Sequence, residues 1–372
     1  MSLTIHGLGT ALPPHRLNQG DATAIAARVA LPEQVPSPSR YRLLETLHRR
    51  SGVGARHVVL EDLTGPNSGS EQSFFGPTSP GTGERMRRYS QEAPPLALRA
   101  VRAALEQAQV PPERITHLIT VSCTGFHAPG VDLALMAALP LPADVARTHV
   151  GFMGCHAALN GLRVAAGFTG ADPGACVLLC AVELCSLHLQ YGWEGERIVA
   201  NALFADGAAA LVASCEAPAT ELSAIAAPAV PGLRRLIASG SLLVPASSGA
   251  MSWAIEDHGF VMGLSPQVPD LIAVHLRPWL EGWLAKQGFT LAAIGCWAVH
   301  PGGPRILSAV TESLSLDPAL IEPSRSVLRD CGNMSSPTLL FILERLRRSG
   351  APGPCLAIAF GPGLSVEVAL LE

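Results

Sequence analysis

The sequence predicts an α/β protein built from two similar halves with buried sheets. Apolar, strand-like runs alternate with helical runs along the chain. Each half closes with a pair of strands, at 175–182 and 204–212 in the first half and at 355–360 and 364–369 in the second. With 372 residues, 48% hydrophobic and 15% charged, the chain is long and apolar enough for two domain-sized cores. We place the N-terminal half at residues 1–218 and the C-terminal half at residues 219–372.

Periodicity and turn residues predict the strands and helices of the first half. Apolar alternation indicates strands at 3–8 and 115–122, and amphipathic spacing indicates helices at 21–30, 40–50, 94–109 and 131–139. Residues 64–83 are rich in Gly, Pro, Ser and Asn, which is typical of a surface loop, and we expect that loop to be mobile.

The second half shows the same alternation of strands and helices. Strands are expected at 222–226, within 252–262 and at 294–299, and helices at 269–287, from 305 onward and at 338–348. Ser336 and Pro337 precede the last helix and suit its N-cap and first turn.

Charge and cysteine usage exclude several classes of protein. A net charge of -4, a sequence pI near 6.3 and the lack of any Lys or Arg run argue against nucleic-acid binding. No apolar run is long enough to span a membrane, and the N-terminus does not resemble a signal peptide. Nine cysteines, an odd count in apolar contexts, indicate reduced thiols, a cytoplasmic protein and no metal site.

Cys155 stands where an extended run ends in a Gly-Phe-Met-Gly turn and a helix of small residues begins. Taken alone, it reads as one more buried apolar residue. At a helix N-terminus, however, the partial positive charge of the first turn favours a thiolate and lowers the cysteine pKa. Cys155 is therefore a candidate nucleophile if suitable partners accompany it.

Two later residues supply such partners. His300 follows a buried strand and opens a Pro-Gly-Gly-Pro turn, and Asn333 lies in a turn ahead of a helix. Each alone has an ordinary structural role, as a hydrogen-bonded histidine or a turn-forming asparagine. Together, a thiol, an imidazole and a carboxamide provide a nucleophile and two donors for one oxyanion.

Five short runs, in order over nearly the whole chain, resemble type III polyketide synthases of the chalcone synthase-like group. They are Gly154-Cys155-His156-Ala157, Phe204-Ala205-Asp206-Gly207, His300-Pro301-Gly302-Gly303, Gly332-Asn333-Met334-Ser335-Ser336 and Phe360-Gly361-Pro362-Gly363. The resemblance implies the thiolase fold, with αβαβα layers and two pseudo-duplicated halves, and a homodimer. It also implies acyl-CoA and malonyl-CoA as substrates, with no metal and no cofactor.

The resemblance further implies a role for each matched residue. Cys155 would carry the starter as a thioester, while His300 and Asn333 would stabilise the enolate and oxyanion as malonyl-CoA loses carbon dioxide. Phe204 would guide the malonyl carboxylate, and Gly361, Pro362 and Gly363 would shape the cyclisation cavity. His300 and Asn333 are neutral at rest in this scheme, although an imidazolium paired with a thiolate fits the sequence equally well.

Departures from the plant pattern concern the substrate. Cys123 and Thr124 stand in a Ser-Cys-Thr-Gly turn, Ala128 replaces a Met that reaches into the partner subunit, and Met262 replaces a gatekeeping Phe. These residues suggest room for a long aliphatic acyl chain, as in bacterial alkylpyrone and alkylresorcinol synthases. Among the basic positions for CoA only Arg50 matches, so delivery by an acyl carrier protein stays open.

Two other readings of the sequence remain. A ketoacyl-ACP synthase III-like enzyme shares the Cys, His and Asn set but performs a single condensation, and its His-Gln-Ala-Asn run is absent here. A non-catalytic partner subunit of a condensing pair would keep the fold, but such partners commonly lack the nucleophile that Cys155 supplies. The sequence leaves the starter, the number of extensions and the mode of ring closure open.

Overall fold

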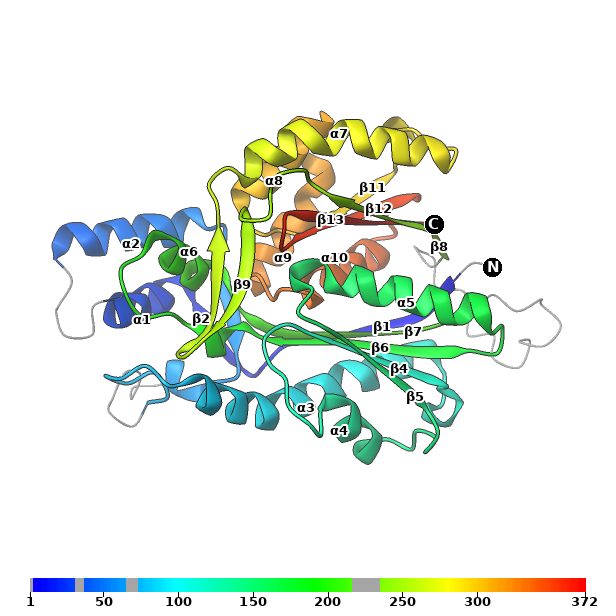
Figure 1. The fold of residues 1–372 in the computed structure, drawn as a ribbon, viewed down its shortest axis with the longest axis horizontal. Helices are drawn as coiled ribbons and strands as arrows, with labels where there is room; N and C mark the ends of the chain where they lie inside the picture. Colours follow the sequence, from blue (N-terminus) through cyan, green and yellow to red (C-terminus); the bar gives the residue numbers. More distant parts are fainter. Residues whose placement is uncertain (1–2, 31–36, 65–72, 216–234) are drawn as a thin grey trace.

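The computed structural model describes residues 3–30, 37–64, 73–215 and 235–372 (Figure 1). Within them, nine strands follow one hydrogen-bonded order, β11-β12-β13-β8-β1-β7-β6-β4-β5. The first half contributes β1 (Leu3–Ala11), β4 (His117–Ser122), β5 (Ala146–Gly151), β6 (Cys176–Leu184) and β7 (Asp206–Cys215). The second half contributes β8 (Arg235–Leu243), β11 (Cys296–Val299), β12 (Cys355–Gly361) and β13 (Ser365–Leu371). Among these described residues, β1 pairs with β8 through Leu3 with Leu236 and Thr4 with Arg235.

Strand pairing confirms that the two halves are similar. In the first half β4 runs parallel to β6, and β6, β7 and β1 then pair antiparallel. In the second half β11 runs parallel to β12, and β12, β13 and β8 pair antiparallel in the same order. The expected boundary after residue 218 and the expected strand at 222–226 lie outside the described residues.

Helices complete five layers (Figure 1). One outer layer holds α3 (Thr82–Ala108) and α4 (Val131–Ala138), the central layer holds α5 (Ala157–Ala171) and α10 (Pro337–Arg348), and the other outer layer holds α7 (Val268–Lys286) and α8 (Pro304–Leu314). Successive strand residues face opposite layers, so Leu178 packs toward α3 while Leu179 packs toward the central helices. The architecture is the αβαβα arrangement expected of the thiolase fold.

Smaller elements surround one end of the sheets. They are β2 (His15–Asn18), α1 (Gln19–Ala30), α2 (Pro38–Arg50), β3 (Ala55–Val58), α6 (Gly195–Leu203), the hairpin β9 (Met251–Glu256) and β10 (Gly259–Leu264), and α9 (Glu322–Cys331). Short 3-10 turns lie at Glu61–Leu63, Pro112–Arg114, Gly154–His156, Cys185–His188, Leu291–Ala293 and Pro318–Ile321.

Several expected boundaries are wrong. The helix expected from residue 94 begins at Thr82, because the buried stripe that includes Tyr89, Ala93 and Ala97 continues through Pro94 and Pro95. Most of the loop expected at 64–83 is either outside the described residues or a series of turns before Thr82. No helix in the described parts of the chain is long and apolar enough to cross a membrane.

Candidate active site

The turn that carries Cys155 links β5 to α5. β5 ends at Gly151, Phe152 adopts a left-handed φ of 57°, and Cys155 lies in the 3-10 turn Gly154–His156 that leads directly into α5. Gly154 has φ 73°, and a Cβ there would lie 2.6 Å from Cδ of Pro362. Only glycine suits this position, because both the backbone angle and the contact with Pro362 exclude a side chain.

A second turn, before α10, brings Asn333 to Cys155 through Ser335. The Ser335 hydroxyl donates to Cys155 Sγ over 3.5 Å, and the Ser335 amide donates to Asn333 Oδ1 over 2.9 Å. Asn333 is itself fixed by its backbone, since its N–H donates to Leu203 and its carbonyl accepts from Ala205. These two bonds flank Phe204 and hold the aromatic residue and Asn333 side by side.

His300 follows β11 directly, and its amide donates to Ile358 of β12. Its side chain is 1% exposed, and neither ring nitrogen has a hydrogen-bond partner among the described residues. A buried polar group without a partner is unusual in a folded protein and marks a candidate functional group. β12, to which the His300 amide is bonded, also meets the nucleophile turn, because a Cβ on Gly361 at its end would lie 2.2 Å from the His156 ring.

Burial controls the protonation of both groups. It raises the pKa of the Cys155 thiol to about 11, while the Ser335 hydrogen bond acts in the opposite direction and the Glu183 carboxylate adds to the rise. Burial also lowers the pKa of His300 to about 3. Both shifts favour a neutral thiol and a neutral imidazole, against the expectation that the helix N-terminus lowers the pKa of Cys155.

Glu183 accepts hydrogen bonds from two turns that border the Cys155 cavity. This fully buried carboxylate accepts from the amides of Cys123 and Thr124, from the Thr124 hydroxyl, and from Ser336 at 2.6 Å. Ser336 is the N-cap residue of α10 and Pro337 opens the helix, as predicted, but the Ser336 hydroxyl donates to Glu183 and makes no capping hydrogen bond. The Thr124 hydroxyl is likewise bound to Glu183, although the residue lines the cavity.

The cavity at Cys155 is compact. It measures about 40 Å³ and its lining includes Cys123, Thr124, Phe204, Met262 and Pro362. Trp253 of β9 also lines it and donates from its indole N–H to the Cys123 carbonyl over 2.7 Å. Trp253 is not among the residues predicted for the site, and it occupies part of the space expected for a long acyl chain.

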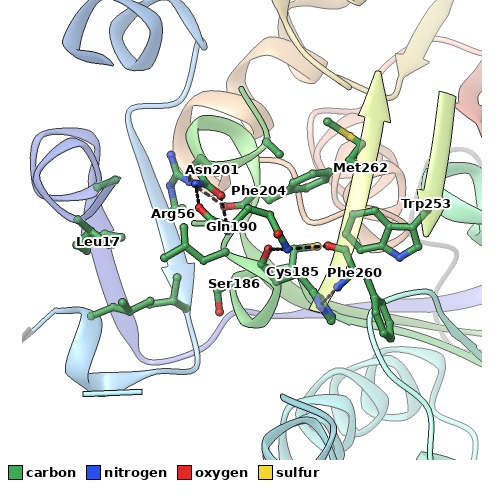
Figure 2. Close-up of a pocket in the computed structure, with 17 residues that line it drawn as sticks. Leu17, Arg56, Cys185, Ser186, Gln190, Asn201, Phe204, Trp253, Phe260 and Met262 are labelled. Atoms are coloured by element: carbon green, nitrogen blue, oxygen red, sulfur yellow. Dashed lines mark hydrogen bonds between the residues drawn. The ribbon is translucent and has the colours of Figure 1, made fainter. Parts of the chain in front are cut away.

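A second cavity of about 40 Å³ adjoins the first and shares Phe204, Trp253 and Met262 with it (Figure 2). Figure 2 shows these three side chains at one end of the second cavity and Leu17 across from them. Arg56 lies beside Asn201 along the same wall and donates to its carbonyl over 2.8 Å. The shared side chains separate a cavity at the nucleophile from one that reaches toward α1.

Other expected site residues fall in three places. Pro362 lines the Cys155 cavity, while Gly361 and Gly363 hold its loop, with Gly363 at φ 91°. Ala128 is exposed, next to a cis bond to Pro129, and within a single chain it lies outside both cavities. The sequence placed it opposite a partner subunit, and its surface position fits that expectation better than a role in this chain's own cavity.

Arg50 lines a much larger groove of about 820 Å³. The groove runs between α2 and the start of α8, and Leu203, Gly302 and Gly303, close to His300 in the chain, line it too. Arg305 is a second cation on this groove, and sequence reasoning missed it. The sequence signal for Arg305 is its position five residues after His300, which predicts a place near the site.

The structure thus links the half-buried Cys155 thiol to the Asn333 carboxamide through Ser335, and it places the buried imidazole of His300 at the end of β11, in a duplicated, five-layered fold. The fold is that of the condensing enzymes of the thiolase class. In the described residues, no group of three His, Cys, Asp or Glu side chains is arranged to hold a metal ion.

Comparison with known proteins identifies the family. The models for the N-terminal and C-terminal domains of chalcone and stilbene synthases match residues 2–217 and 235–372. The chain belongs to this family, the type III polyketide synthases, which are acyltransferases. It is 30% identical to an alpha-pyrone synthesis polyketide synthase-like protein, Pks18, of Mycobacterium tuberculosis, over 99% of this chain and 90% of that one. It is 32% identical to the 1,3,6,8-tetrahydroxynaphthalene synthase of Streptomyces peucetius subsp. caesius, over 99% and 93% of the two chains.

Solved structures agree. PKS-I from the brown alga Ectocarpus siliculosus has a TM-score of 0.90 at 30% identity, and covers 100% of this chain and 98% of its own. The type III domain of Steely1, a type I/III hybrid from Dictyostelium, has a TM-score of 0.89 at 27% identity, with 100% and 99% coverage. The family assignment therefore favours repeated condensation over the ketoacyl-ACP synthase III-like reading.

Proposed function

We propose that the protein condenses an acyl-CoA starter with malonyl-CoA units on Cys155 and releases a cyclised pyrone or resorcinol. One observation carries the assignment of the site: the Ser335 hydroxyl and amide connect the Cys155 sulfur to the Asn333 carboxamide. The buried His300 imidazole, whose nitrogens have no partner among the described residues, is proposed to face the same cavity. The reaction needs a nucleophile and oxyanion donors in one dry cavity, and this cluster offers both.

In the first step the Cys155 sulfur attacks the starter thioester. The thiol proton passes to His300 as the S–C bond forms, and the CoA thiolate leaves and takes that proton. A neutral imidazole can accept the proton, while an imidazolium could not. Ser335 stabilises the developing thiolate by its hydrogen bond.

In the second step malonyl-CoA loses its carboxylate as carbon dioxide, and the electron pair of the broken C–C bond moves into the thioester carbonyl. The resulting enolate oxygen needs donors, which Asn333 and His300 supply. Phe204 offers an apolar face where the carboxylate leaves, since loss of charge is favoured by poor solvation. The enolate carbon then attacks the Cys155 thioester and frees the sulfur.

The volumes of the two cavities limit the length of the acyl starter. Because each measures only about 40 Å³, a long aliphatic chain fits only if Trp253 moves aside and its tail enters the second cavity. We therefore propose a starter whose tail passes Phe204 and Met262 toward Leu17. A panel of acyl-CoA starters of increasing length tests this proposal.

The large groove is proposed to take the CoA portion. Arg50 and Arg305 are its two cations, and they suit phosphate groups. An acyl carrier protein could present the same phosphopantetheine arm there. Turnover of acyl-CoA and acyl-carrier starters at equal concentration distinguishes the two, because a free CoA thioester suffices only if the groove itself holds the nucleotide.

We also propose a homodimer in the cytoplasm. Phe126, Phe152 and Met153 are exposed near the Cys155 turn, and Ala128 lies beside them in the sequence, which supports a partner surface there. All nine cysteines are free, which suits a reducing compartment. Sedimentation analysis of the purified protein tests the dimer.

The proposed reaction uses thioesters alone, without a metal or other cofactor, and activity is expected to survive dialysis against EDTA. The decisive assay incubates the protein with acyl-CoA and malonyl-CoA and identifies products by mass spectrometry. Pyrones or resorcinols carrying several malonyl units are expected. A single acetoacyl thioester would favour the ketoacyl synthase alternative, and full activity of Cys155→Ala would favour a non-catalytic role for the site.

A further inference from the structure

His156, the residue after Cys155, makes contacts that the condensation chemistry does not use. It is 2% exposed, and both of its ring nitrogens are hydrogen bonded. Nδ1 pairs with Asn160 Oδ1 at 2.6 Å, one turn along α5, and Nε2 pairs with Ser365 Oγ at 2.7 Å, at the start of β13. The ring therefore connects the nucleophile turn in the first half to a strand in the second half.

The connection continues to the cavity wall. Ser365 donates its hydroxyl proton to the Pro362 carbonyl over 3.0 Å, and Pro362 lines the cavity at Cys155. The His156 ring also lies against the backbone of Gly361, where a Cβ would be 2.2 Å from Cδ2 of the ring. The loop at 361–363 and the Cys155 turn are thus fixed to each other at His156 and again where Pro362 meets Gly154.

The far end of the same loop is held independently. The Gly363 amide donates to Met251, and the Gly363 carbonyl accepts from Ser247 over 2.8 Å. Loss of the contact between His156 and Ser365 would therefore loosen the Pro362 end, which would still meet Gly154, while the Gly363 end stays in place. In a cavity of about 40 Å³, a small shift of one wall changes the available space substantially.

We propose that His156 is a positioning residue that ties the cavity wall at Pro362 to the Cys155 turn and thereby sets which cyclised product forms. This inference rests on the proposed function, because it assigns the cavity to the growing chain. It predicts that the contact affects how many extensions precede ring closure and leaves acyl transfer to Cys155 intact. Specificity of this kind depends on the wall position at the level of single side chains.

Ser365→Ala tests the proposal, because it removes the hydroxyl between His156 and Pro362 and changes no residue of the Cys155 turn itself. We expect the ratio of the longest to the shorter pyrone products to change at least threefold, while single-turnover acylation of Cys155 stays within twofold of the wild type. Ser365→Thr keeps a hydroxyl on a strand position that favours threonine, and it should restore the wild-type ratio.

Thr169→Ala is the matched control, since Thr169 is a buried hydroxyl farther along α5 that bonds only to its own helix at Ala166. It should leave the product ratio unchanged. His156→Phe, which removes both hydrogen bonds, should change the ratio as Ser365→Ala does if both variants show wild-type thermal unfolding.

An unchanged ratio in a folded Ser365→Ala variant would overturn the proposal. An equal loss of all products in every buried-hydroxyl variant would also overturn it, because it would reveal only a structural role. Failure of the proposed function looks different, since the wild-type protein would then form neither an acyl-Cys155 thioester nor a cyclised product.

Discussion

Ser335→Ala isolates the hydrogen bond that the nucleophile receives. The Ser335 hydroxyl lies 3.5 Å from Cys155 Sγ and is the one group that lowers the pKa of that thiol against burial. Alanine keeps the Cβ, so the left-handed φ of 56° at this position gains no new strain, and the amide bond to Asn333 remains. The substitution therefore removes the hydrogen bond to Cys155, together with the contact of 3.3 Å between the Ser335 hydroxyl and Cys123 Sγ.

The magnitude follows from the strength of such a bond. A hydrogen bond to a charged group contributes roughly 1.5 kcal/mol, which corresponds to about one pKa unit. Because the wild-type pKa is raised to about 11, the thiolate fraction falls about tenfold for each unit by which the pH is lowered below that value. At any pH from 7 to 10, alkylation of Cys155 in the variant should be about tenfold slower.

The assay follows iodoacetamide alkylation of the Cys155 peptide by mass spectrometry across pH 7–11. The wild-type rate should rise steadily toward pH 11, and the variant curve should lie about one pH unit higher. Thr169→Ala should match the wild type. A wild-type rate that levels off below pH 9, or identical wild-type and Ser335→Ala curves, would refute the account of the resting thiol.

Three further predictions concern other parts of the site. Trp253→Ala should lengthen the longest accepted acyl-CoA starter by several carbons, because it merges the two cavities, and a starter panel that gives the wild-type cutoff would contradict this. Arg305→Glu should raise KM for acyl-CoA about tenfold or more with kcat little changed, as expected for uniform binding of phosphates, whereas a kcat effect alone would argue against a phosphate contact. Stability should fall as pH drops below 6.5, because burial lowers the pKa of His48, His188 and His300 to about 4, 3 and 3, so the unfolded chain takes up protons first. Each histidine contributes up to about 1.4 kcal/mol per pH unit. Asp206 offsets part of this loss of stability, because burial raises its pKa to about 6. A free energy of unfolding, measured with denaturant, that stays constant from pH 6.5 to 5 would exclude the effect.

Much of the fold was predictable because it depends on local patterns. Buried strands such as β6 and β12 are continuous apolar runs, and each candidate residue stands where such a run meets a turn. Cys155, His300 and Asn333 were therefore found at element ends before their neighbours were known. The duplicated halves were also visible in the repeated order of elements.

Other features depend on contacts between distant segments. Trp253 lies on the largely exposed strand β9, yet its indole N–H donates to the Cys123 carbonyl and its ring lines the cavity. Ser336 has the sequence of a helix cap, but Glu183 takes its hydroxyl. Burial, which sequence reasoning cannot measure, reverses the expected direction of the Cys155 pKa.

Peptide mass mapping of the wild-type protein after a brief incubation with starter acyl-CoA most directly tests whether the buried thiol is the acyl carrier. The starter mass should appear on the peptide that contains Cys155, and His300→Gln should slow its appearance. Acylation of Cys123 instead, or no acylated cysteine in a protein that still makes product, would contradict the account.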